Sequence, residues 1–231
     1  MTYTQDLQAT IEAIGREYPR IAAWFRAFSG ADWARPTFCP GWSAAKAAGH
    51  LAFGAEFFAE AITNGLKGYV GLPYGAGSWE EFMRIRDAKA EEIGRLSGAA
   101  LVDRFESNMA AVVKLFRSLA PEDYERPAWH RRAVFPIRRF IFSRLNELLL
   151  HEWDIRNQPG APLAQDAVPV AAWNRPGDHG ADAAFSASAG DMLLLTSGRA
   201  DVERCKREGR FRVEGDAAKA SALMPKLFFP L

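Results

Sequence analysis

The chain contains few cysteines, no marked excess of either charge and no long apolar run. Two cysteines among 231 residues cannot form a disulfide framework, so we expect a protein of the reducing cytoplasm. The 29 basic and 28 acidic residues leave a net charge of +1, which argues against nucleic acid or an anionic membrane surface as a partner. No apolar stretch approaches the length of a membrane span, and the polar N-terminus predicts no signal peptide.

Apolar residues make up 48% of the chain and recur at helical spacing through its first two thirds. In the first pattern, apolar side chains follow one another at steps of three and four residues, which places them on one face of an amphipathic helix. The third pattern is broken or bent at Ser97-Gly98, and a loop precedes the fourth. Helices of this number and length predict a mainly α protein built on a four-helix bundle. The patterns cover residues 7–28, 43–66, 78–119 and 137–156.

The composition changes after Pro159, where a small α+β appendage is expected to begin. Asp191–Ser197 is a short apolar run that fits either a buried strand or the end of a helix. Phe211–Asp216 alternates and stops at a Gly-Asp turn, so it predicts a strand, and Ala217–Leu227 predicts a last helix. The expected domains are residues 1–158 and 159–231.

Glu147 and His151 stand four residues apart within the apolar fourth helix. That spacing puts both side chains on one face, one turn apart, where a carboxylate and an imidazole can bind one metal ion. His50 in the second helix is the natural third ligand, because packed helices lie about 8–10 Å apart and can share an ion. Chance supplies such a pair readily, so an ion pair within the helix and a core role for His50 remain alternatives.

Three other features of the sequence allow more than one interpretation. Cys39 lies beside a Pro-Gly turn and is either a small buried side chain or a reactive thiol. His130 falls in an expected loop and is interpreted as an ordinary surface residue. A cluster of arginines next to it predicts a solvated loop and helix start, with an anion-binding rim as the alternative. The cluster consists of Arg131, Arg132, Arg138 and Arg139.

Three segments resemble one known family. Trp33–Leu51, WARPTFCPGWSAAKAAGHL, resembles the N-terminal motif of mycothiol-dependent maleylpyruvate isomerase-like proteins, which belong to the DinB-like four-helix metalloenzymes. Leu148–Pro162 resembles that family's H-x-W-D-I-R segment, and Leu193–Asp216 is similar to the end of its sterol-carrier-like C-terminal domain. The resemblance implies a DinB-like four-helix bundle followed by a shortened sterol-carrier-like domain. Residues 161–190 are short and irregular where that second domain would begin.

The resemblance also implies a metal ion and a thiol cofactor. Members of the family hold a divalent ion, usually zinc, on residues that match His50, Glu147 and His151 here. Three protein ligands leave one position open, and the family uses it for mycothiol, whose thiol loses its proton on coordination. The implied function is an isomerase or S-transferase that acts on a small electrophile such as maleylpyruvate.

Neighbouring residues have supporting roles in this interpretation. Asp154, one turn after the second histidine ligand, is expected to accept its imidazole N–H. Arg144 either steadies an anionic carboxylate of the substrate or pairs with the ligand carboxylate. Arg84 and Arg86 are candidates for binding an acidic substrate.

Two other classes of function stay open. A hydrolase could use metal-bound water on the same bundle, without a thiol. In a non-catalytic binding module, the bundle and its appendage could hold an apolar or amphipathic small molecule in a cleft. The expected partners are a small-molecule substrate and a thiol rather than nucleic acid or a membrane, and a homodimer is left open.

Overall fold

The computed structural model describes residues 3–158 and 183–228. The chain divides into two compact units, Met1–Pro162 and Leu163–Leu231. The fold is mainly helical with two small two-stranded sheets among the described residues, which confirms the expected class. Within those residues, no helix is both long and apolar enough to cross a membrane.

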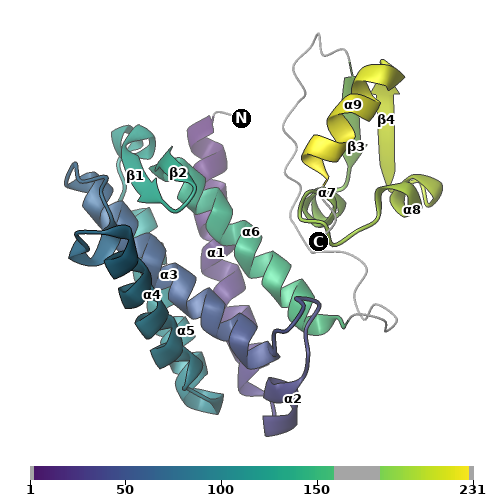
Figure 1. Cartoon of the computed structure of the whole chain (residues 1–231). Coiled ribbons are helices and arrows are strands. Elements are labelled where there is room, and N and C mark those ends of the chain that lie inside the picture. Colours follow the sequence, from purple (N-terminus) through teal and green to yellow (C-terminus); the bar gives the residue numbers. More distant parts are fainter. Residues whose placement is uncertain (1–2, 159–182, 229–231) are drawn as a thin grey trace. The chain divides into compact units, whose positions relative to one another are not determined.

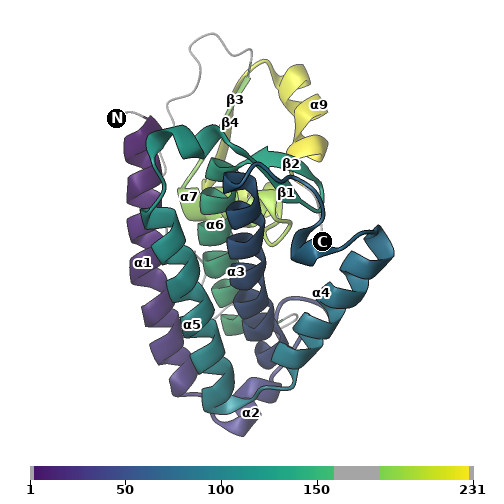
Figure 2. The ribbon, with the colours of Figure 1, turned by 90° about the vertical axis from the view of Figure 1, so that its left-hand side faces the viewer.

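Four long helices form the core of the first unit (Figures 1 and 2). The first contacts the third and fourth of these, and the second contacts the same two, so the four close into a bundle. Short helical turns join them. The bundle helices are α1 (Tyr3–Arg26), α3 (Ala44–Leu66), α5 (Gly98–Arg117) and α6 (Ile137–Arg156); the turns include α2 (Gly30–Ala34), η1 (Pro73–Gly75) and η2 (Pro121–Glu125).

Local sequence explains where the helices begin and which faces they bury. The side chain of Ser43 accepts the backbone N–H of Lys46 at 3.2 Å, which confirms it as the N-cap of α3. Along α1 most of the apolar stripe is buried: Leu7, Ile11 and Ile14 are fully buried, and Tyr18 is partly buried. Each such side chain contributes roughly 1.5–3 kcal/mol of burial free energy, so the stripe determines which face of α1 meets the bundle.

The third helical pattern forms two helices instead of one bent helix. α4 (Trp79–Gly94) packs on the outside of α3, and only α5 enters the bundle (Figure 2). The chain turns between them at Gly98, whose φ of +52° is accessible to glycine at little cost. α4 buries only Phe82 and Ile93, which suits a helix with one side in solvent.

The expected loop before α6 contains a β-hairpin. Strands β1 (Pro127–His130) and β2 (Ala133–Pro136) pair antiparallel, with His130 opposite Ala133. β1 packs against α3, and Ala128 is fully buried there. Four-residue strands carry too few alternations to be recognised from the sequence, which explains why the hairpin was missed.

Gly65, near the end of α3, allows the hairpin to approach the helix. A Cβ atom added there would lie 2.5 Å from the carbonyl oxygen of Pro127 and 3.0 Å from the Cβ of Ala128. Since backbone must shift to relieve this contact, Gly65→Ala is expected to lower the free energy of unfolding by about 1–3 kcal/mol in urea denaturation. Gly94→Ala is the matched control, because a Cβ at that helical position meets nothing within 4 Å. Equal stability of the two variants would contradict the expectation.

A buried carboxylate joins α1 to the end of α6. Glu152 accepts hydrogen bonds from Arg20 at 2.7 Å and from Arg156 at 2.7 Å. Burial opposes ionisation of Glu152, but these two guanidinium groups outweigh it and hold the pKa of the carboxyl below its usual value. The contact holds the last turns of α6, which carry the candidate site, against α1.

The second unit is a small α+β fold. β3 pairs antiparallel with β4, and Leu195, Cys205 and Phe211 form the centre of its core. The expected strand and last helix are confirmed, and the apolar run from Asp191 belongs to a helix. Most of the irregular segment 161–190 lies outside the described residues. The elements are β3 (Ala183–Ala187), α7 (Ala189–Thr196), α8 (Val202–Arg207), β4 (Phe211–Gly215) and α9 (Ala217–Leu227).

Candidate metal centre

The segment that precedes α3 folds into a tight loop against the end of α6. The backbone N–H of Thr37 donates to the carbonyl oxygen of Trp42 at 2.9 Å and closes the loop. The N–H of Phe38 donates to the carbonyl oxygen of Asp154 at 2.9 Å and ties the loop to α6. These two hydrogen bonds bring Cys39 and Trp42 to the last turns of α6.

Two of the three predicted ligands meet inside the bundle. The rings of His50 on α3 and His151 on α6 have centroids 4.9 Å apart and lie nearly perpendicular. Trp42 covers both rings, with centroid distances of 5.1 and 5.8 Å. Burial, aided by the charges of His151 and Arg144, lowers the pKa of His50 to about 4. The His50 imidazole is therefore neutral at pH 7 and retains a lone pair for a ligand.

Asp154 contacts both His151 and Cys39. Its Oδ2 atom lies 2.9 Å from Nδ1 of His151, and it accepts from Sγ of Cys39 at 3.1 Å. Because a carboxylate only accepts, Nδ1 of His151 is assigned a proton, which leaves Nε2 as the ring nitrogen that can coordinate an ion. A carboxylate in this position fixes the orientation of a metal-binding imidazole.

Glu147, the third predicted ligand, lies one turn before His151 on α6. Its Oε2 atom is 2.9 Å from Nη2 of Arg144, and its side chain is 30% exposed. Arg144 is fully buried and also donates to the carbonyl oxygen of Leu51 at 3.3 Å. Gly54 makes room for the pair, since a Cβ there would lie 2.8 Å from Nη1 of Arg144 and 3.3 Å from Oε2 of Glu147.

A second set of potential ligands shares His151. The ligand atoms of Cys39, His151 and Asp154 lie within 4.8 Å of one another, so this cluster could also hold a metal ion. Sequence reasoning missed the set because Cys39 is 115 residues from Asp154, as their hydrogen bond records. The only signal was the Pro-Gly turn beside Cys39. Of the two interpretations of that cysteine, the small buried side chain is wrong, because Cys39 is partly exposed and hydrogen-bonded.

The two ligand sets predict different responses to substitution. If His50, Glu147 and His151 hold the ion, Asp154→Asn removes an orienting partner and weakens zinc binding by about 10–100-fold. Cys39→Ser then changes the affinity little, because the thiol is outside that set. Competition with a chromophoric chelator measures both constants. Loss of the ion in Cys39→Ser would instead favour the set that contains Cys39.

The two arginines expected to bind an acidic substrate lie in different environments. Arg86 on α4 is one of the charges that lower the pKa of His50, which places it near the cluster. Arg84 is 74% exposed, and its guanidinium lies 3.8 Å from a carboxylate oxygen of Glu81. Of these two arginines, Arg86 is the one whose charge acts on the candidate centre.

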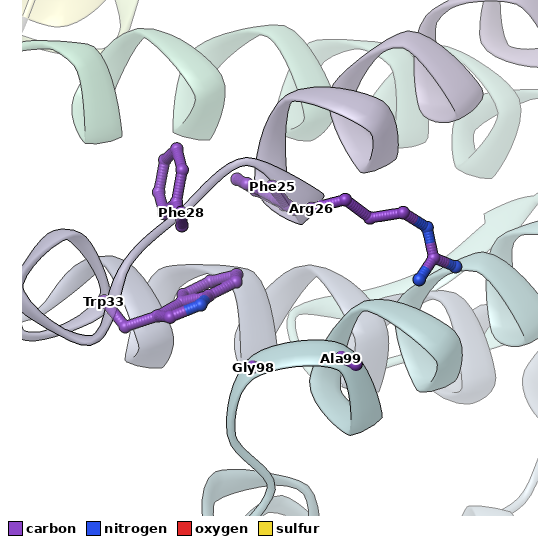
Figure 3. A pocket seen from close by; sticks show the side chains of 6 residues that line it. All are labelled: Phe25, Arg26, Phe28, Trp33, Gly98 and Ala99. Atoms are coloured by element: carbon purple, nitrogen blue, oxygen red, sulfur yellow. The ribbon is translucent and has the colours of Figure 1, made fainter.

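A separate hollow lies between α1, α2 and the start of α5 (Figure 3). It encloses about 280 Å³ and contains none of the candidate ligands. Phe25, Phe28 and Trp33 line it, and its charged residue, Arg26, is paired with Asp103 at 2.9 Å. Mutual packing of these aromatic rings accounts for the residues around the hollow.

Facing histidines on two helices, with a carboxylate one turn away, define a four-helix-bundle protein with a candidate metal centre. Residues 14–156 match the family model described as the mycothiol maleylpyruvate isomerase N-terminal domain, and the chain belongs to this family. The match confirms the family that the sequence motifs indicated.

Similar solved structures include crystal structures of the mycothiol-dependent maleylpyruvate isomerase, one of them a histidine-to-alanine mutant. Each superposes with a TM-score of 0.56 at 16% identity, over 67% of this chain and 63% of that chain. The similarity therefore establishes the fold and covers less than two thirds of the length of those structures. The search of curated proteins found no match.

Proposed function

We propose that this protein is a metal-dependent enzyme that uses a low-molecular-weight thiol such as mycothiol. The enzyme would either isomerise a small electrophile such as maleylpyruvate or attach the thiol to it through the sulfur atom. The observation that carries the proposal is the contact between the rings of His50 and His151, with Glu147 one turn away. Membership of a family described by a mycothiol-dependent isomerase supports the choice of reaction.

The side chains present fit a divalent ion such as zinc. The His50 imidazole is neutral, and the contact with Asp154 leaves Nε2 of His151 for coordination. Oε2 of Glu147 is buried. It forms an ion pair with Arg144, but it accepts no hydrogen bond from the described residues. Two imidazoles and a carboxylate make a common catalytic zinc set with one open position. An ion held there would favour the thiolate form of a small thiol.

Other residues of this chain prepare the centre for that chemistry. Asp154 holds the ring of His151 in one orientation, and Arg144 holds the carboxylate of Glu147. Trp42 covers the two imidazoles and limits the access of water to them. Arg86 contributes positive charge near the centre, which favours an anionic substrate over a neutral one.

Turnover with and without thiol tests the proposal. The zinc-loaded full chain is mixed with maleylpyruvate and mycothiol, and conversion to the trans isomer is followed by absorbance. We expect turnover only when metal and thiol are both present, with loss of activity after treatment with a chelator. The same reaction with 1-chloro-2,4-dinitrobenzene tests S-transfer. Absence of both reactions in the zinc-loaded protein would contradict the proposal, as would metal-dependent ester hydrolysis without thiol.

A further inference from the structure

The face of α3 that carries His50 continues toward the β-hairpin. His50, Gly54 and Phe57 follow at steps of four and three residues, so they share one stripe. Phe57 is two turns beyond His50, or about 10 Å along the helix axis. The ring of His130 lies there, with centroids 6.4 Å from Phe57 and 6.3 Å from Phe58. His130 therefore stands about two helical turns from the candidate centre.

A stripe of side chains on α6 also extends from the candidate centre to His130. Phe140 and Glu147 are seven residues apart, which again is two turns on one face. The ring of Phe140 lies 5.9 Å from that of His130. The charge of Glu147 also acts on His130, where it opposes the lowering of the pKa. Both stripes thus connect the candidate metal centre to the hairpin.

The interpretation of His130 as an ordinary surface residue is wrong. It is half-buried on β1, and the ring of Phe135 packs against it at 5.5 Å. Its Nδ1 atom accepts the backbone N–H of Arg132 at 3.3 Å, so Nε2 carries the proton of the neutral ring. Burial, together with the charge of Arg132, lowers the pKa of His130. At pH 7 the residue presents a neutral N–H donor.

Three arginines of the hairpin turn and of the start of α6 act on His130. Arg131 and Arg132 form the turn of the hairpin, and the guanidinium of Arg139 lies 4.2 Å from the ring centroid of Phe135. All three are among the charges that act on His130. No carboxylate of the described residues pairs with them, whereas nearby Arg138 pairs with Glu125 at 3.1 Å. Guanidinium groups without acidic partners, beside an N–H donor, suit an oxyanion.

We propose that His130, Arg131, Arg132 and Arg139 form an oxyanion-binding subsite for the carboxylate or phosphate group of a small molecule. The other end of that molecule would reach the metal centre, and this assignment to the substrate rests on the proposed function. The separation of about two helical turns, or 10 Å, selects an elongated ligand over a compact one. The hairpin would then contribute specificity, while His50, Glu147 and His151 contribute chemistry.

Proton NMR of the full chain tests the subsite without any turnover. The ring Hε1 signal of His130, assigned through His130→Gln, is followed during separate titrations with glutarate and with inorganic phosphate. We expect a saturable shift with at least one of these anions and none with the neutral analogue glutaramide. Replacing Arg131 and Arg132 together by glutamine is expected to raise the dissociation constant at least tenfold, because charged hydrogen bonds are lost.

Two further variants separate the possible outcomes. Arg95→Gln with Arg104→Gln removes the same charge from two arginines that pair with Glu91 and Glu92, and is expected to leave the dissociation constant unchanged. His50→Ala tests independence from the metal centre and is expected to keep anion binding even when zinc is lost. Absence of a saturable shift with both anions would overturn the subsite. Equal weakening in both double variants would overturn it as well, since a general charge effect would then explain the binding.

Discussion

Zinc is expected to be lost from the purified protein when either His50 or His151 is replaced by alanine. The wild-type chain is expected to hold one ion, which elemental analysis and chelator competition measure. The two rings face each other from different helices at 4.9 Å, so each supplies a ligand that the other helix cannot replace. Loss of an outer partner costs about 10–100-fold in affinity, and loss of a direct ligand is expected to cost more than 100-fold.

The matched control for this experiment is His130→Gln. It removes a half-buried histidine that contacts none of the three proposed ligands, and zinc content is expected to stay near one per chain. Circular dichroism establishes that each variant remains folded. Full zinc occupancy in both His50→Ala and His151→Ala would falsify the proposed ligand set. Zinc lost from Cys39→Ser but retained in His50→Ala would place the ion in the other cluster.

The metal-free protein is expected to lose about 3 kcal/mol of stability between pH 7 and pH 4 through His50 alone. Burial lowers the pKa of this imidazole from an ordinary 6.5 to about 4. Between those values the unfolded chain binds a proton that the folded chain excludes, so stability rises with pH. The contribution is fully present above pH 6.5 and is lost as the pH falls toward 4, below which both states are protonated.

Urea denaturation in the presence of a chelator, repeated between pH 7 and pH 4, measures this effect. His50→Gln keeps a polar side chain of similar size but cannot take up the proton. The variant is therefore expected to show a shallower decline in unfolding free energy over the same interval, with the difference close to 3 kcal/mol. Parallel curves for the two proteins would show that the pKa of His50 is the same in the folded and unfolded states, which would contradict the expectation.

The sequence predicted the bundle helices because their signals are local. Ser43 marks the start of α3 through its own side chain, and the stripe from Leu7 to Ile14 needs only helical geometry to define a buried face. The hairpin β1–β2 depends on packing against Gly65 and could not be recognised locally. The separation of α4 from α5 likewise depends on which helix the bundle accepts, and Ser97-Gly98 alone did not decide between a bend and a break.

The candidate centre likewise has one part that the sequence predicts and another that only the structure shows. The four-residue step from Glu147 to His151 is a property of the helix, and it can be found in the sequence. The contacts of Asp154 with Cys39 and with Nδ1 of His151 join residues from a loop and a helix far apart in the chain. Spacing along the chain carries no information about such contacts, which is why the role of Cys39 was missed.

The sequence by itself determined the helical class, the family and the three residues proposed as ligands. These follow from short-range periodicity and from motifs that are complete within single segments. Only the tertiary structure decided that His50 meets His151, that Arg144 is buried beside Glu147, and that His130 of the hairpin packs against the helix face that carries His50. Those facts depend on how helices and a hairpin pack, and packing is set by side-chain volume and burial over the whole bundle.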